Sequence, residues 1–139
     1  MNENLELNHR LLKFTGLEIA QIWGWWDMCG DFNPNLLPGE RQEYDTDLIW
    51  CYNDDGFWRP APNFLDPYLG IAEFFRWIAP KLGNKYAYSI QLVGDGKWLV
   101  EIEQDKHGVV ASCIDRNLSI AAAKAVEQRI GSWRGKNNR

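Results

Sequence analysis

The sequence lacks the long apolar run that a membrane-spanning helix needs, which is about 20 residues. Its first ten residues, MNENLELNHR, are polar and do not resemble a secretory leader. It has only three cysteines, Cys29, Cys51 and Cys113, and no Cys-x-x-Cys pair. An odd number of widely spaced cysteines argues against a disulfide scaffold, so we expect a reduced protein of the cytoplasm with no membrane association.

The motifs of metal and nucleophile chemistry are also missing. The two histidines, His9 and His107, stand at no zinc-ligand spacing relative to the cysteines. There is no Gly-x-Ser-x-Gly motif. The stretch VGDGKW is predicted to be a turn between strands and not a phosphate-binding loop. These absences predict a protein without a cofactor, a bound metal or catalytic residues.

Positive charge is scarce as well. The formal net charge is −4, with 15 Lys and Arg against 19 Asp and Glu. The only basic cluster lies near the C-terminus and consists of Arg129, Arg134, Lys136 and Arg139. Phosphate backbones are bound by clustered Lys and Arg, so nucleic acid is disfavoured as a partner, and residues 132–139 are expected to be a frayed basic tail.

Aromatic residues are abundant by contrast. Eight Trp, five Tyr and six Phe occur in 139 residues. Tryptophan is large and its indole N–H needs a partner, so it is often only partly buried. Some of the eight indoles are therefore expected near the surface.

The hydrophobic spacing predicts three helices and three strands. Apolar residues recur at three- and four-residue steps over residues 4–22, which indicates an amphipathic helix with Gly16 as a weak point. A second helix is predicted from Asp66 as N-cap and Pro67 as first residue, ending near Pro80 and Gly83. The alanine-rich stretch SIAAAKAVEQRI predicts a last helix, capped by Asn117 or Ser119 and ending at Gly131.

The strands are predicted between the second and the last helix. Residues 86–93, 97–103 and 108–115 are separated by short turns, which favour an antiparallel meander. Residues 27–56 read as a long irregular insertion with one short strand at 47–52. The chain is thus expected to be a single α+β domain over residues 1–139, with a three-stranded meander packed in layers against about three helices.

Three segments resemble the phage ABA sandwich domain family, small proteins encoded mostly by bacteriophages and prophages. The first is a leading helix that runs into Gly-Trp, in LNHRLLKFTGLEIAQIWGW. The second is Trp58-Arg59-Pro60-Ala61-Pro62-Asn63-Phe64, and the third is KWLVEIEQDKHGVVASCIDRNLSIAAAKAVEQ. The resemblance covers residues 5–24 and 57–128 and is absent from 27–56. It implies a phage or prophage origin, hence a bacterial host, and a layered fold. It implies no activity.

Acidic residues crowd the stretch without this resemblance: Asp27, Asp31, Glu43, Asp45, Asp47, Asp54 and Asp55. Paired carboxylates hold Mg²⁺ or Ca²⁺ or act as acid and base, so a metal-assisted hydrolase is one hypothesis. Sequences such as DTD and NDDG are also ordinary turn and cap sequences. The alternating ligand pattern of a calcium loop is absent.

The aromatic residues of the same region give the main functional hypothesis. Trp98 and Trp77 are assigned to the core, and Trp58 to packing of the loop, which leaves the indoles around the insertion. They either form a small core under the loop or a recognition surface, because Trp and Tyr concentrate at the energetic centres of interfaces and stack on planar ligands. The predicted binding residues are Trp25, Trp26, Trp50, Tyr52, Trp58, Asp54 and Asp55.

We therefore expect a non-enzymatic phage accessory protein that binds a host bacterial protein, for example as an inhibitor of host defence or of a host enzyme. A protein that binds or sequesters a small planar, nucleotide-like molecule is the alternative, and the metal-assisted hydrolase ranks below it. An exposed edge of the three-stranded sheet also favours pairing into a homodimer.

Overall fold

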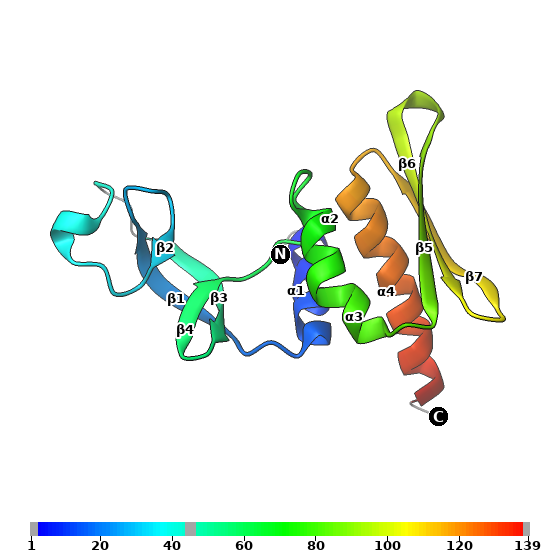
Figure 1. The fold of residues 1–139 in the computed structure, drawn as a ribbon, viewed down its shortest axis with the longest axis horizontal. Coiled ribbons are helices and arrows are strands. Elements are labelled where there is room, and N and C mark those ends of the chain that lie inside the picture. Colours follow the sequence, from blue (N-terminus) through cyan, green and yellow to red (C-terminus); the bar gives the residue numbers. More distant parts are fainter. Residues whose placement is uncertain (1–2, 44–46, 138–139) are drawn as a thin grey trace. The chain divides into compact units, whose positions relative to one another are not determined.

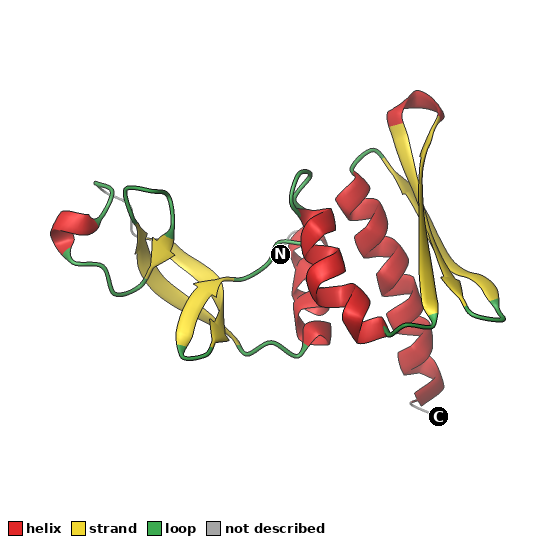
Figure 2. Cartoon of the chain, viewed as in Figure 1, coloured by secondary structure: helices red, strands yellow, loops and turns green. Residues whose placement is uncertain are grey.

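The computed structural model describes residues 3–43 and 47–137, with the backbone alone for 131–137. The chain is an α+β protein, as predicted, but it has two antiparallel sheets instead of one (Figures 1 and 2). Its contacts divide it into two compact units. Unit 1 comprises residues 1–15 with 62–139, and unit 2 comprises residues 16–61. Whether the two units fold as the single predicted domain stays a prediction.

Unit 1 is built on the meander of β5 (Tyr86–Val93), β6 (Lys97–Gln104) and β7 (Gly108–Asp115), in that order across the sheet. These strands match the predicted segments closely. The turn at η3 (Gly94–Gly96) joins β5 to β6, with Asp95 at a positive φ of 64°. A bulge between Ile102 and Glu103 shifts the register of β6 against β7.

Helix α4 (Leu118–Asn137) packs on strands β6 and β7 and is itself packed against α1 (Glu3–Thr15) (Figure 1). The side-chain amide of Asn117 accepts the backbone N–H of Ser119 at 2.9 Å and of Ile120 at 3.3 Å, so the predicted cap is confirmed. Small side chains around several sides of the helix are buried: Ala121, Ala122, Ala123 and Ala125. A helix that is apolar on several sides is a central helix, and alanine lets its neighbours come close.

The ends of two predicted helices need correction. The first helix stops at Thr15, because Gly16 adopts a φ of +75° that ends a helix and favours glycine. The last helix does not stop at Gly131 and continues to Asn137. Residues 132–137 of the predicted frayed tail are therefore helical, and residues 138 and 139 lie outside the described residues.

The second helical stretch consists of α2 (Gly70–Glu73), the π-helical turn η2 (Phe74–Ile78) and α3 (Ala79–Leu82). Asp66 Oδ1 accepts the backbone N–H groups of Tyr68 and Leu69 at 2.8 Å, although regular helix begins only at Gly70. The helix passes through Pro80, which has no N–H and would crowd the preceding turn of a regular α-helix. The wide turn of η2 accommodates this interruption, and Gly83 with φ of 99° follows the end.

An aromatic cluster joins this stretch to the sheet. The rings of Phe74, Phe75 and Tyr88 meet edge to face with centroids 5.1 to 5.6 Å apart. The Tyr88 hydroxyl is buried and finds no hydrogen-bond partner in the described part of the chain. Burial raises the pKa of Tyr88, and the charge of nearby Tyr86 adds to the effect.

We expect Tyr88→Phe to raise the free energy of unfolding by about 1 kcal/mol, because it removes a buried polar group that lacks a partner. The raised pKa also means that the native chain loses stability as alkaline pH rises through that pKa, a loss that the variant lacks. Denaturant unfolding at neutral and alkaline pH measures both. The matched control is Tyr86→Phe, since Tyr86 Oη accepts from Arg129 Nε at 3.0 Å and its loss should destabilise. Equal destabilisation by both variants would contradict this account.

Unit 2 is a four-stranded antiparallel sheet in the order β2-β1-β3-β4. Its strands are β1 (Ile19–Trp26), β2 (Phe32–Asn33), β3 (Asp47–Asp54) and β4 (Phe57–Pro60), and a short 3-10 turn, η1 (Pro38–Glu40), follows β2. The prediction of an irregular insertion over 27–56 is therefore wrong, although the short strand expected at 47–52 lies within β3. The end of the first predicted helix, residues 19–22, belongs to β1.

The edge of the unit 1 sheet at β7 is occupied by a side chain. Gln128 of α4 donates from Nε2 to the carbonyl of Ser112 at 2.9 Å and accepts the backbone N–H of the same residue on Oε1 at 3.3 Å. The amide thus makes the pair of hydrogen bonds that a neighbouring strand would make.

Candidate functional site

The strands of unit 2 divide the aromatic residues between two faces. Residues directly opposite each other in an antiparallel pair point to the same side, and neighbours along a strand point to opposite sides. Trp23 pairs with Leu48, and Gln21 pairs with Trp50. One face of β1 and β3 therefore carries Trp23, Leu48 and Trp50 together.

The other face forms the interior of unit 2. Strand β2 contacts β4 although β1 and β3 lie between them in the sheet, so the sheet curls around this face. The ring of Phe32 fills the space over Gly24, where a β-carbon would lie 2.2 Å from the ring. Trp26 meets Phe32 edge to face at 5.6 Å and donates from Nε1 to Asp47 Oδ2 at 3.0 Å. Cys51 is fully buried here, which raises its pKa.

The outward face is apolar and exposed. Trp23 is 60% exposed, Leu48 43% and Trp50 37%. Phe57 on β4 is 68% exposed and pairs with Asp54, which alternation along β3 places on the same side as Trp50. We call these four residues, Trp23, Leu48, Trp50 and Phe57, the aromatic face. Large apolar side chains gathered on one exposed surface are typical of interaction sites.

The seven residues predicted from sequence do not all reach this face. Trp50 belongs to it. Trp25 lies on the same side by alternation, but the guanidinium of Arg41 sits 3.6 Å from the centre of its ring. Tyr52 is also on this side and is buried. Trp26 and Trp58 point to the other side, since Trp58 pairs with Asn53.

The two acids of that set have structural surroundings. Asp54 forms an ion pair with Arg59 at 3.3 Å. Asp55 lies in the turn between β3 and β4 with a φ of 51°, followed by Gly56 at 87°. This turn conformation suits Asp and Gly, which is why the sequence NDDG occurs here.

Another acid of the region, Asp27, stabilises a turn. Asp27 Oδ1 accepts the N–H groups of Cys29 and Asp31, both at 2.8 Å, and so closes the turn after β1. Asp45 lies outside the described residues. Among residues 3–43 and 47–137, no three His, Cys, Asp or Glu side chains are grouped as metal ligands.

Sequence reasoning missed Trp23, Leu48 and Phe57 as members of the site. The segments IAQIWGWW and DLIWCYND are apolar on both sides of a strand, so no alternation of polar and apolar residues marks these three. The side that each takes follows only when residues 19–26 are read as a strand. The spacing of Ile19 and Ile22 instead suggested a continuing helix.

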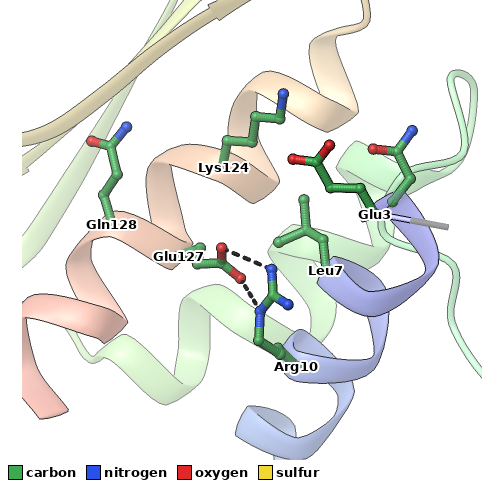
Figure 3. Close-up of a pocket in the computed structure, with 7 residues that line it drawn as sticks. Glu3, Leu7, Arg10, Lys124, Glu127 and Gln128 are labelled. Atoms are coloured by element: carbon green, nitrogen blue, oxygen red, sulfur yellow. Dashed lines mark hydrogen bonds and ion pairs between the residues drawn. The ribbon is translucent and has the colours of Figure 1, made fainter. Parts of the chain in front are cut away.

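Unit 1 contains an open groove of about 540 Å³ between α1 and α4 (Figure 3). Arg10 spans it and donates to Glu127 at 2.6 and 3.0 Å, a contact that raises the pKa of Arg10. Both side chains are substantially exposed, so this ion pair contributes at most about 1 kcal/mol. The pair engages two of the four charged side chains that line the groove, the others being Glu3 and Lys124.

Comparison of the chain with protein-family models, with curated proteins and with solved structures finds no match. None of the helices in the described part of the chain combines the length and the apolar character that a membrane span requires. The aromatic face of unit 2 is the candidate functional site.

Proposed function

We propose that this protein is a non-enzymatic binding protein whose aromatic face contacts a partner protein. The observation that carries the proposal is the exposure of Trp23, Leu48, Trp50 and Phe57 on one side of a small sheet. Tryptophan and other aromatic residues supply much of the binding energy of interfaces, because each buries a large rigid surface. Three of the acids that sequence analysis offered for catalysis have structural partners, which favours binding over catalysis: Asp27 caps a turn, Asp54 pairs with Arg59 and Asp47 accepts from Trp26.

We also propose a phage origin and a bacterial host protein as the partner. The segments that resemble the phage ABA sandwich domain are residues 5–24 and 57–128, whereas the stretch without resemblance, 27–56, lies inside unit 2. The resembling segments also take in residues 16–24 and 57–61 of unit 2, so Trp23 and Phe57 of the aromatic face lie within them, whereas Leu48 and Trp50 do not. We infer that the layered meander and helices of unit 1 correspond to the family, and that unit 2 carries the interaction surface.

A small planar ligand is less well supported. Stacking between indoles needs an open ring, and Arg41 already covers one side of Trp25, while Trp26 packs against Phe32. The exposed rings of Trp23 and Trp50 lie on the outward side of the sheet, where a broad protein surface fits better than an enclosed small molecule.

The test is capture of proteins from bacterial lysate by the purified chain. We expect the double variant Trp23→Ala, Trp50→Ala to reduce the captured partner at least about tenfold, because each substitution removes a large contact ring. Tyr68→Ala is the matched control, since Tyr68 is also an exposed aromatic residue but belongs to unit 1. It should leave capture unchanged. Undiminished capture by the folded double variant would refute the aromatic face as the binding surface.

A further inference from the structure

Charge is divided unequally between the two units. Residues 16–61 contain nine Asp and Glu but only two Arg, a formal net charge of −7. The rest of the chain contains ten Asp and Glu against thirteen Lys and Arg, a net charge of +3. The overall value of −4 therefore conceals a strongly acidic unit that carries the aromatic face.

Both positively charged side chains of unit 2 contact groups of the same unit. Arg41 stacks on Trp25 and donates to the carbonyl of Leu36 at 2.9 and 3.1 Å. Arg59 pairs with Asp54. Six carboxylates among the described residues of the unit are exposed to solvent: Glu18, Asp31, Glu40, Glu43, Asp47 and Asp55. Two of them, Glu18 and Asp47, accept hydrogen bonds from side chains of the same unit.

We propose that the occupant of the aromatic face is a basic protein surface, in which Lys or Arg side chains surround an apolar centre. This inference rests on the proposed function and specifies its partner. Apolar contact with Trp23, Leu48 and Trp50 supplies affinity, while the charge of −7 attracts a positive surface and repels acidic ones. Acidic proteins and nucleic-acid phosphates are disfavoured as partners by the same field.

The experiment uses three short fluorescent peptides of one amphipathic pattern and the full-length chain. The first combines leucine with lysine, the second leucine with glutamate, and the third serine with lysine. We expect the leucine–lysine peptide to bind best, and its affinity to fall at least about tenfold between about 50 and about 500 mM salt, since salt screens exposed charges. Fluorescence anisotropy measures each dissociation constant.

Two variants separate charge from apolar contact. Neutralising four of the exposed acids, by Asp31→Asn, Glu40→Gln, Glu43→Gln and Asp55→Asn, should weaken binding of the leucine–lysine peptide about tenfold and flatten its salt dependence. The Trp23→Ala, Trp50→Ala variant should weaken it by a similar factor while the salt dependence persists. Circular dichroism confirms that both variants are folded.

The outcomes distinguish the two proposals. Equal affinity for the leucine–glutamate and leucine–lysine peptides, with both weakened by the tryptophan variant, overturns the basic partner but keeps the aromatic face. Equal affinity for the serine–lysine and leucine–lysine peptides, unchanged in the tryptophan variant, overturns the aromatic face and with it the proposed function. A salt-sensitive dimer of the chain alone, seen by sedimentation, places a second copy on the face and overturns the basic partner. Failure of all three peptides to bind overturns it as well.

Discussion

Truncation of Phe74 to alanine is expected to lower the free energy of unfolding by about 3–5 kcal/mol. The ring is 2% exposed and lies in the π-helical turn η2, where it meets Phe75 at 5.1 Å and Tyr88 at 5.6 Å. Its removal loses the transfer free energy of the ring and leaves a cavity between the helices and the sheet. Small domains are stable by only about 5–15 kcal/mol, so the loss is a large part of the total.

The matched control for this prediction is Phe75→Ala. Phe75 is the next residue, belongs to the same cluster and is 42% exposed, so its truncation should cost about 1 kcal/mol. Urea unfolding followed by circular dichroism measures both variants. If the two substitutions cost the same, Phe74 is not the centre of the unit 1 core.

Replacement of Gly70 by alanine is expected to cost about 2–3 kcal/mol, the upper part of the range for overpacked cores. A β-carbon at this position would lie 2.4 Å from the carbonyl oxygen of Phe64 and 2.7 Å from the hydroxyl oxygen of Ser119. The first of these atoms belongs to the backbone, so a side-chain rotation cannot relieve the contact. The start of α2 would have to move away from α4, with loss of packing around the fully buried Ser119.

Gly94→Ala is the control for this substitution, because no atom lies within 4 Å of its β-carbon position and it belongs to the same unit. It should change the unfolding free energy by less than about 0.5 kcal/mol. Adding Ser119→Gly to Gly70→Ala should restore only part of the loss, since the Phe64 carbonyl remains. Full recovery in the double variant would show that the hydroxyl, and not the backbone, sets the limit.

The elements of unit 1 could be predicted because their patterns are local. Strand β6 places Trp98, Val100 and Ile102 on one side and Glu101 and Glu103 on the other, and Gly94-Asp95-Gly96 marks a tight turn. Asn117 marks the start of α4 for an equally local reason, since its side-chain oxygen accepts hydrogen bonds from backbone N–H groups of the first turn. These signals need no knowledge of distant contacts.

Unit 2 was misread because its strands do not show simple alternation. The sheet curls around one face while the other carries exposed Trp23 and Trp50, so β1 and β3 are apolar on both sides. Strand β2 has two residues, too few for any pattern. Gly16 matters here because its positive φ ends α1 shortly before β1 begins, and a sequence does not reveal φ directly.

Composition indicates the region of the candidate site, but it does not indicate which residues form it. An excess of aromatic residues in acidic surroundings points to residues 23–58. Which rings face outward depends on register, because Trp25 and Trp26 are neighbours with opposite directions and Trp23 pairs with Leu48 across the sheet. That pairing joins residues 25 positions apart, a long-range contact that no local spacing encodes.

The side-chain amide of Gln128 also limits aggregation through pairing of strand edges. It forms hydrogen bonds with both backbone groups of Ser112, so a strand from another molecule cannot pair with β7 at this residue. One glutamine side chain on α4 thereby protects this strand edge, a role that proline or lysine has in other folds. The protection holds only while α4 is packed on the sheet. A strand of another molecule can therefore pair with this edge of β7 in a partly folded chain, but not in the native one.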